Sequence, residues 1–140
     1  MGKILCSTRG GEASYRAQDA AIALAKERGD TLVFLYVVDM RFLDKMRRST
    51  IVPVEQEVTK MGKFLLVMAQ ERAAEQGVEA TTVCRKGEFR PELENAAREE
   101  TVSLIVLGRP ADGESMFELA ALQIVATDVQ RKTGVETRII

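Results

Sequence analysis

Five short apolar runs alternate along this chain with longer stretches that have the period of an amphipathic helix. The apolar runs cover residues 3–7, 31–38, 78–85, 103–107 and 135–140. The helical stretches between them cover residues 12–28, 53–76, 90–100 and 115–132. Strands that are separated by helices run parallel, and right-handed crossovers leave few topologies. The alternation therefore predicts an α/β fold, a doubly wound five-stranded parallel sheet with helices on both faces.

The helical stretches carry recognisable end signals. Gly29 and Gly77 follow the first two stretches, where a left-handed residue ends a helix, and Pro53 opens the second. The spacing predicts that the buried stripe of the second helix contains Val54, Val58, Met61, Leu65, Met68 and Ala69. The chain shows neither an internal repeat nor a linker, so we expect residues 1–140 to form a single domain.

Charge and residue inventory argue against several classes of function. The chain has 20 basic and 21 acidic residues, a balance that favours neither nucleic acid nor an anionic membrane as a partner. The longest apolar run, residues 32–38, is too short to span a bilayer, and the first residues lack a signal peptide. The chain has no histidine, the commonest general base and an important metal ligand. We therefore expect a cytoplasmic protein that is not an enzyme, with no catalytic residue and no metal site.

Ligands of doubly wound sheets bind at the carboxyl ends of the strands, where the strand order reverses. Neither a P-loop nor a GxGxxG motif is present, so the candidate site rests on the loops themselves. The candidate nucleotide- or anion-binding residues are Thr8, Arg9, Gly10, Val38, Gly108, Arg109, Gly113 and Ser115. Amide groups at helix N-termini, together with the guanidinium groups of Arg9 and Arg109, would suit a phosphate or a carboxylate. The alternative is two tight turns with two solvated arginines.

The stretch that follows the second predicted strand is irregular and basic. It contains Arg41, Lys45, Arg47 and Arg48. One interpretation is a solvated surface loop or short helix. The other is a basic rim over the same edge of the sheet.

Four segments in register resemble the universal stress protein family. They are KILCSTRGGEAS at 3–14, ALAKERGDTLVFLYVVD at 23–39, VCRKGEFRPELENAA at 83–97 and SLIVLG at 103–108. No segment is specific alone, but the set spans nearly the whole chain. The resemblance implies the strand order 3-2-1-4-5 and a small cytoplasmic protein that is commonly a homodimer. One branch of that family binds ATP or AMP between the first and fourth strands.

The chain departs from the nucleotide-binding branch at two places. Arg9 stands where that branch has an acid that holds ribose, and a guanidinium group cannot accept a hydrogen bond. Gly108 matches the first glycine of the phosphate loop, but Ala111 takes the place of the second, and the loop is shorter. The resemblance therefore implies a regulatory stress-response module with weakened or lost nucleotide binding, acting on an unidentified protein partner. Two alternatives remain: an ATP- or AMP-binding protein with slow ATP hydrolysis, and a sensor of another small anion.

The last apolar run carries the candidate dimer interface. The resemblance implies that this strand pairs with its symmetry mate. Antiparallel pairing centred on Thr137 would place Glu136 opposite Arg138 of the second copy, twice. The alternative is that these charges keep the edge from pairing.

The implied strand order also makes a prediction about the two cysteines. Cys6 and Cys84 would lie on the first and third strands, with the second strand between them. Neighbouring strands are about 4.8 Å apart, so the two sulfur atoms would be roughly 10 Å apart, too far for a disulfide.

Overall fold

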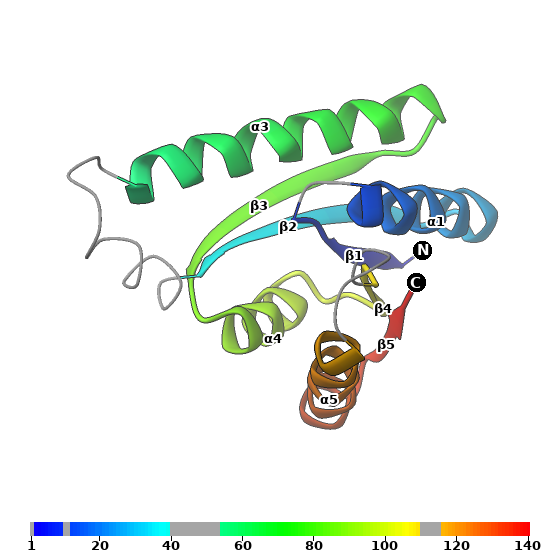
Figure 1. Ribbon diagram of the computed structural model, residues 1–140. Helices are drawn as coiled ribbons and strands as arrows, with labels where there is room; N and C mark the ends of the chain where they lie inside the picture. The colour runs from blue at the N-terminus through cyan, green and yellow to red at the C-terminus, as the bar shows by residue number, and fades with distance from the viewer. Residues whose placement is uncertain (1, 10–11, 40–53, 110–115) are drawn as a thin grey trace.

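The computed structural model describes residues 2–9, 12–39, 54–109 and 116–140, and its centre is a parallel sheet (Figure 1). The strands are β1 (Lys3–Ser7), β2 (Thr31–Asp39), β3 (Ala80–Gly87), β4 (Leu104–Leu107) and β5 (Glu136–Ile139). Every strand pair is parallel, and the order is β3-β2-β1-β4-β5. The predicted fold class and strand order are confirmed.

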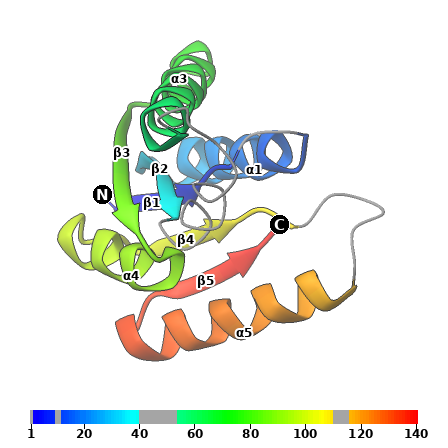
Figure 2. The ribbon, with the colours of Figure 1, turned by 60° about the vertical axis from the view of Figure 1, so that its left-hand side comes forward.

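Helices cover both faces of this sheet (Figures 1 and 2). The helices are α1 (Glu12–Arg28), α3 (Val54–Glu75), α4 (Phe89–Glu99) and α5 (Met116–Thr133). Side chains alternate along each strand, so Ile4 and Cys6 pack toward α1 and α3, whereas Leu5 packs toward α4 and α5. The protein therefore has two apolar cores, one on each face. None of the helices in the described ranges is long and apolar enough to cross a membrane.

Two glycines end the helices where the sequence predicts. Gly29 has a φ of 71° and Gly77 a φ of 75°, in the left-handed region that L side chains rarely adopt. Each residue turns the chain from a helix into the next strand, β2 or β3.

The predicted buried stripe of α3 is correct in part: Ala69 is buried, and Val58, Leu65 and Met68 are half-buried. The residues of α3 that are buried are Gly62, Leu66, Ala69 and Ala73. Met61, which was expected to be buried, is 54% exposed. The reason is the close approach of α3 to Tyr36 of β2, because a Cβ at Gly62 would lie 2.4 Å from Cδ1 of that ring. Three small residues, Gly62, Ala69 and Ala73, together with Leu66, therefore form the face of α3 that packs most deeply on the sheet.

Both cysteines are free thiols on strands that β2 separates. Cys6 lies beside Phe34 of β2, and Cys84 lies beside Tyr36 of the same strand. Cys6 is fully buried, and this burial raises the pKa of its thiol to about 12. The order of strands on which the cysteine prediction depended is confirmed.

The strands at the two edges of the sheet, β3 and β5, each bind a glutamine from the neighbouring helix. On β3 the carbonyl oxygen of Ala80 accepts a hydrogen bond from Nε2 of Gln70, at 2.7 Å. On β5 the N–H of Thr137 donates to Oε1 of Gln130, at 3.0 Å. An edge strand offers unpaired backbone groups to other chains, and here a side chain occupies one such group at each edge.

Candidate functional site

The turn after β1 uses its backbone donors within the protein. Thr8 is buried, its N–H donates to the carbonyl oxygen of Leu35 at 2.8 Å, and its Oγ1 accepts from Nε2 of Gln18 at 2.7 Å. Arg9 is exposed, but its N–H donates to Oγ of Ser14 at 3.0 Å. At these two residues, both backbone N–H groups are therefore engaged within the protein, whereas the Arg9 residue is exposed.

The end of β4 has the same character. Gly108 is half-buried and Arg109 is exposed. The N–H of Arg109 donates to the carbonyl oxygen of Ile140, and the N–H of Ile140 donates to Leu107, both at 2.9 Å. The hydrogen bonding between β4 and β5 therefore continues past the ends of both strands, and it engages the backbone N–H of Arg109.

The two arginines leave the sheet at the same edge. Cys6 of β1 is in register with Val106 of β4, and Arg9 and Arg109 each follow by three positions. Within the described part of the chain, neither guanidinium group takes part in an ion pair. The predicted pairing of two cationic groups at the carboxyl ends of β1 and β4 is thus compatible with the topology.

The remaining predicted site residues divide into two groups. Val38 is fully buried in β2, so its side chain belongs to the interior. Gly10, Gly113 and Ser115 lie outside the described residues, as does the basic stretch 41–48.

Gln18 is a buried polar residue beside this edge that the sequence prediction missed. It is 2% exposed, and its Oε1 is buried without a hydrogen-bond partner, whereas its Nε2 is bonded to Thr8. The signal was present, because Gln18 interrupts a helix face that otherwise buries Ala17, Ala21 and Ala25. A buried oxygen without a donor is costly, so this atom marks a place where a donor group would be stabilised.

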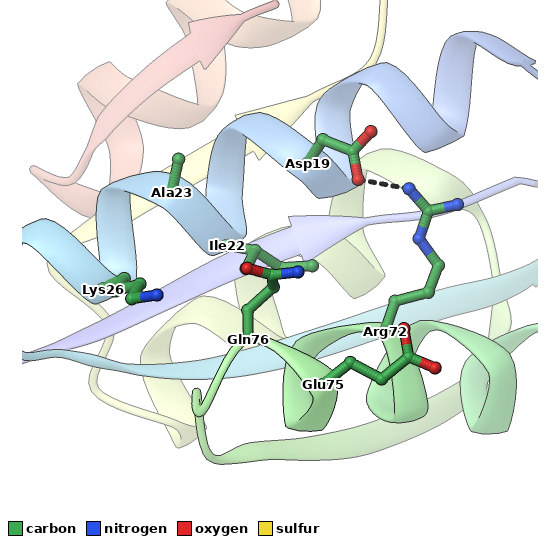
Figure 3. Close-up of a pocket in the computed structure, with 7 residues that line it drawn as sticks. All are labelled: Asp19, Ile22, Ala23, Lys26, Arg72, Glu75 and Gln76. Atoms are coloured by element: carbon green, nitrogen blue, oxygen red, sulfur yellow. Dashed lines mark hydrogen bonds and ion pairs between the residues drawn. The ribbon is translucent and has the colours of Figure 1, made fainter.

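A second candidate site is a groove between α1 and α3, with a volume of about 500 Å³ (Figure 3). It is lined by Asp19, Ile22, Ala23, Lys26, Arg72, Glu75 and Gln76. An ion pair between Asp19 and Arg72 joins the two helices beside it, and Arg72 also lies 4.7 Å from the centre of the Tyr15 ring. Two acidic and two basic residues line the groove, so its charge selects neither an anion nor a cation.

The candidate dimer residues lie on β5, at an edge of the sheet. Glu136 and Arg138 form an ion pair with each other within the chain. The N–H of Thr137, between them, points away from β4 and is bound by Gln130. Both charges and the central backbone donor are thus engaged inside one copy of the chain.

Over residues 2–9, 12–39, 54–109 and 116–140, no group of three or more cysteine, aspartate or glutamate side chains could hold a metal ion.

Comparisons with known proteins agree with this fold. A model described as the universal stress protein family matches residues 1–135. Universal stress protein YxiE of Bacillus subtilis is 37% identical over 124 residues, which cover 77% of this chain and 78% of that protein. A crystal structure from the universal stress protein family of Burkholderia pseudomallei is 27% identical, with a TM-score of 0.70 and coverage of 99% of this chain and 95% of that one.

One further related structure was solved in complex with a nucleotide. The universal stress protein from Archaeoglobus fulgidus, solved in complex with dAMP, has a TM-score of 0.67, covers 100% of this chain and 97% of that one, and is 17% identical. At 17% sequence identity, the similarity between the two structures shows that they share a fold.

Proposed function

The chain belongs to the universal stress protein family, and from that premise we propose that it is a non-enzymatic stress-response module whose nucleotide site is weakened or lost. The observation that carries this proposal is the state of the backbone amides at the carboxyl ends of β1 and β4. The N–H groups of Thr8, Arg9 and Arg109 all donate within the protein. A phosphate cradle needs such groups to be available, so these amides would have to give up existing bonds to bind one.

The chemistry of Arg9 supports the same proposal. Ribose hydroxyl groups are held well by an acceptor, and Arg9 offers only donors. A protein of this fold binds dAMP, so an AMP-type ligand is the natural competitor to the proposal. ATP, AMP and cyclic AMP are therefore the nucleotides to test.

A second candidate function is a sensor of a small anion, supported by the two exposed guanidinium groups at one edge of the sheet. Arg9 and Arg109 follow neighbouring strands in register, and a planar guanidinium group suits the oxygens of phosphate or a carboxylate. The proposal extends to a cytoplasmic location, to residues 1–140 as one domain and to an unidentified protein partner.

Thermal unfolding with added ligands tests these functions together. A ligand at 100 times its dissociation constant stabilises a protein by about 2.7 kcal/mol. We expect no shift with ATP, AMP or cyclic AMP, and a clear nucleotide-specific shift would overturn the weakened site. A shift with inorganic phosphate that Arg9→Ala and Arg109→Ala both remove, and that Arg16→Ala on the exposed face of α1 leaves intact, would establish the anion sensor.

We also propose that the module forms a homodimer by antiparallel pairing of β5 with its copy. Pairing centred on Thr137 would replace the bond to Gln130 and turn the Glu136–Arg138 pair into two pairs between chains. Mass measured in solution tests this register. Arg138→Glu should break pairing through β5 and lower the mass, Glu136→Arg combined with Arg138→Glu should restore that pairing, and Gln130→Ala should strengthen it. A mass that none of these changes alters would exclude the register.

A further inference from the structure

Helix α3 is the outermost ridge on its side of the molecule (Figures 1 and 2). It exposes large apolar side chains. Phe64 is 63% exposed, Met61 54% and Val67 48%. These residues lie away from the buried residues of the helix, Gly62, Leu66, Ala69 and Ala73. Exposing three large apolar groups within two turns is unfavourable in a helix whose packing on the sheet is already complete.

The exposed face has the spacing of a helix-to-helix seam. Lys60, Phe64, Val67 and Glu71 follow one another at intervals of four, three and four, so they form one continuous stripe. All four residues are exposed. The stripe has an apolar centre, a positive charge at one end and a negative charge at the other. We call these four residues the α3 seam.

We propose that the α3 seam docks on the α3 seam of a second copy of this chain, with the two helices antiparallel about a two-fold axis. Phe64 then packs against the partner's Val67, and Lys60 pairs with the partner's Glu71. Both pairs are symmetric about the peptide between residues 65 and 66, so a single axis produces each of them twice. A two-fold interface requires this self-complementarity.

Charge distinguishes this arrangement from the neighbouring ones. A parallel pair of helices would place Lys60 against the partner's Lys60 and Glu71 against the partner's Glu71. Both contacts join like charges and are repulsive. An antiparallel pair centred on Phe64 would place Glu57 opposite the partner's Glu71, which is also repulsive. The register centred between residues 65 and 66 matches apolar with apolar and plus with minus. The seam is short, so we expect a dimer that dissociates on dilution.

A zero-length cross-linker that joins a lysine to a carboxylate gives a direct test. Lys60 and Glu71 of one helix are 11 residues apart, about 16 Å along the axis, so a direct bond between them can form only between two chains. We expect mass spectrometry to identify a Lys60–Glu71 link, and a mixture of light and heavy-isotope protein to show it joining the two labels. Absence of this link from the dimer fraction would overturn the proposal.

Charge reversal gives an independent measurement by sedimentation over a range of protein concentrations. Lys60→Glu or Glu71→Lys alone replaces two attractive pairs by two repulsive ones, and each should weaken the dimer by roughly tenfold. The double variant, Lys60→Glu with Glu71→Lys, should return the affinity to the wild-type value. Lys3→Glu, the same change at an exposed lysine of β1, is the matched control and should have no effect.

The β5 edge can be separated from the α3 seam with the same assay. In an Arg138→Glu background, the α3 contact should persist and still respond to Lys60→Glu. A wild-type chain that stays monomeric at every concentration would overturn the proposal. A dimer that Arg138→Glu abolishes and Lys60→Glu leaves unchanged would also overturn it, since the contact would then lie on β5 alone.

Discussion

On one face of the sheet, α3 rests on β2 through the contact of Gly62 with the ring of Tyr36, whereas on the other face α4 is tied to β3 by charge. There, Arg85 of β3 binds Glu92 at 2.7 Å and Glu99 at 2.6 Å. The first contact depends on shape and the second on charge. The comparison shows that contacts of different kinds add to the apolar core that each face of the sheet has.

The charged layer continues from α4 to α5. Arg90 of α4 lies 3.3 Å from Asp128 of α5, and Asp128 also pairs with Arg131 and Lys132 of its own helix. Opposite these groups, the α1 and α3 layer buries Cys6 among apolar side chains. Each face has an apolar core, so we expect particular contacts, and not whole layers, to respond to different conditions. The Gly62 contact should be sensitive to overpacking and buried Cys6 to high pH, whereas the ion pairs of Arg85 and Asp128 should be sensitive to acid or salt.

The largest effect is expected from Gly62→Ala. The new Cβ would lie 2.4 Å from Cδ1 and 2.9 Å from Cγ of Tyr36, so the helix or the ring must move. We expect a loss of about 2 kcal/mol in the free energy of unfolding, even though alanine favours a helix. Urea unfolding measures this loss. In a Tyr36→Ala background the same change should be neutral or stabilising, and an equal cost in both backgrounds would show that the ring is not the cause.

A second test raises the pH, which favours ionisation of the buried Cys6 thiol. Burial raises the pKa of Cys6 from 9.0 to about 12, so the folded state resists losing this proton more than the unfolded state does. The stabilisation is complete below pH 9 and is lost as the pH rises toward 12. Near pH 10.5 we expect a loss of about 2 kcal/mol.

The Cys6→Ala variant isolates this thiol. Its urea midpoint should depend less on pH between about 9 and 11 than that of the wild type. Cys84→Ala, at the half-buried thiol, should keep most of the dependence. If Cys6→Ala leaves the dependence unchanged, other groups cause it.

The ion pairs between β3 and α4 are tested by Arg85→Met, which keeps an unbranched apolar stem and removes both ion pairs. We expect a loss of about 1 kcal/mol, because Arg85 is partly buried and binds two carboxylates. The loss should shrink in about 1 M salt, whereas the cost of Gly62→Ala should not. Arg16→Met, at an exposed arginine of α1, is the control. A loss that salt does not reduce would indicate packing of the side-chain stem as the cause.

The smallest effect is expected from Asp128 in acid. Hydrogen bonds from Arg131 and Lys132 lower the pKa of its carboxyl group below the usual value. A lowered pKa contributes stability above the unfolded-state value, and that contribution is lost as the pH falls through the folded-state value. Wild type should therefore exceed Asp128→Asn in urea midpoint at pH 7, and the difference should close below about pH 4. A constant difference would contradict the assignment.

Much of the fold could be predicted because local signals agreed with the global pattern. The first predicted strand and helix coincide with β1 and α1, and Gly29 and Gly77 end helices as expected. The rotation of α3 could not be predicted in this way. Counting apolar residues favours Met61 over Gly62, and only the distance to Tyr36 reverses that choice.

The positions of Arg9 and Arg109 after neighbouring strands could be predicted, but the hydrogen bonding of their backbone amides could not. The sequence places Arg9 and Arg109 after neighbouring strands, which the register of β1 and β4 supports. Whether their amides are available depends on Ser14 and Ile140, residues that carry no sequence signal for this role. The burial of Gln18 depends on its contact with Thr8, which the polar interruption of the alanine face of α1 does not by itself specify.

The glutamines at the two sheet edges should affect the aggregation of the protein at high concentration. Gln70 and Gln130 each occupy a backbone group that an invading strand would need. A misfolded neighbour must first displace an amide before it can extend the sheet, which slows the first step of amyloid-like growth. Because the bond is to a side chain, it can reopen without unfolding. The two glutamines therefore protect the edge strands reversibly. This protection should matter most under heat or crowding, when partly unfolded chains are concentrated.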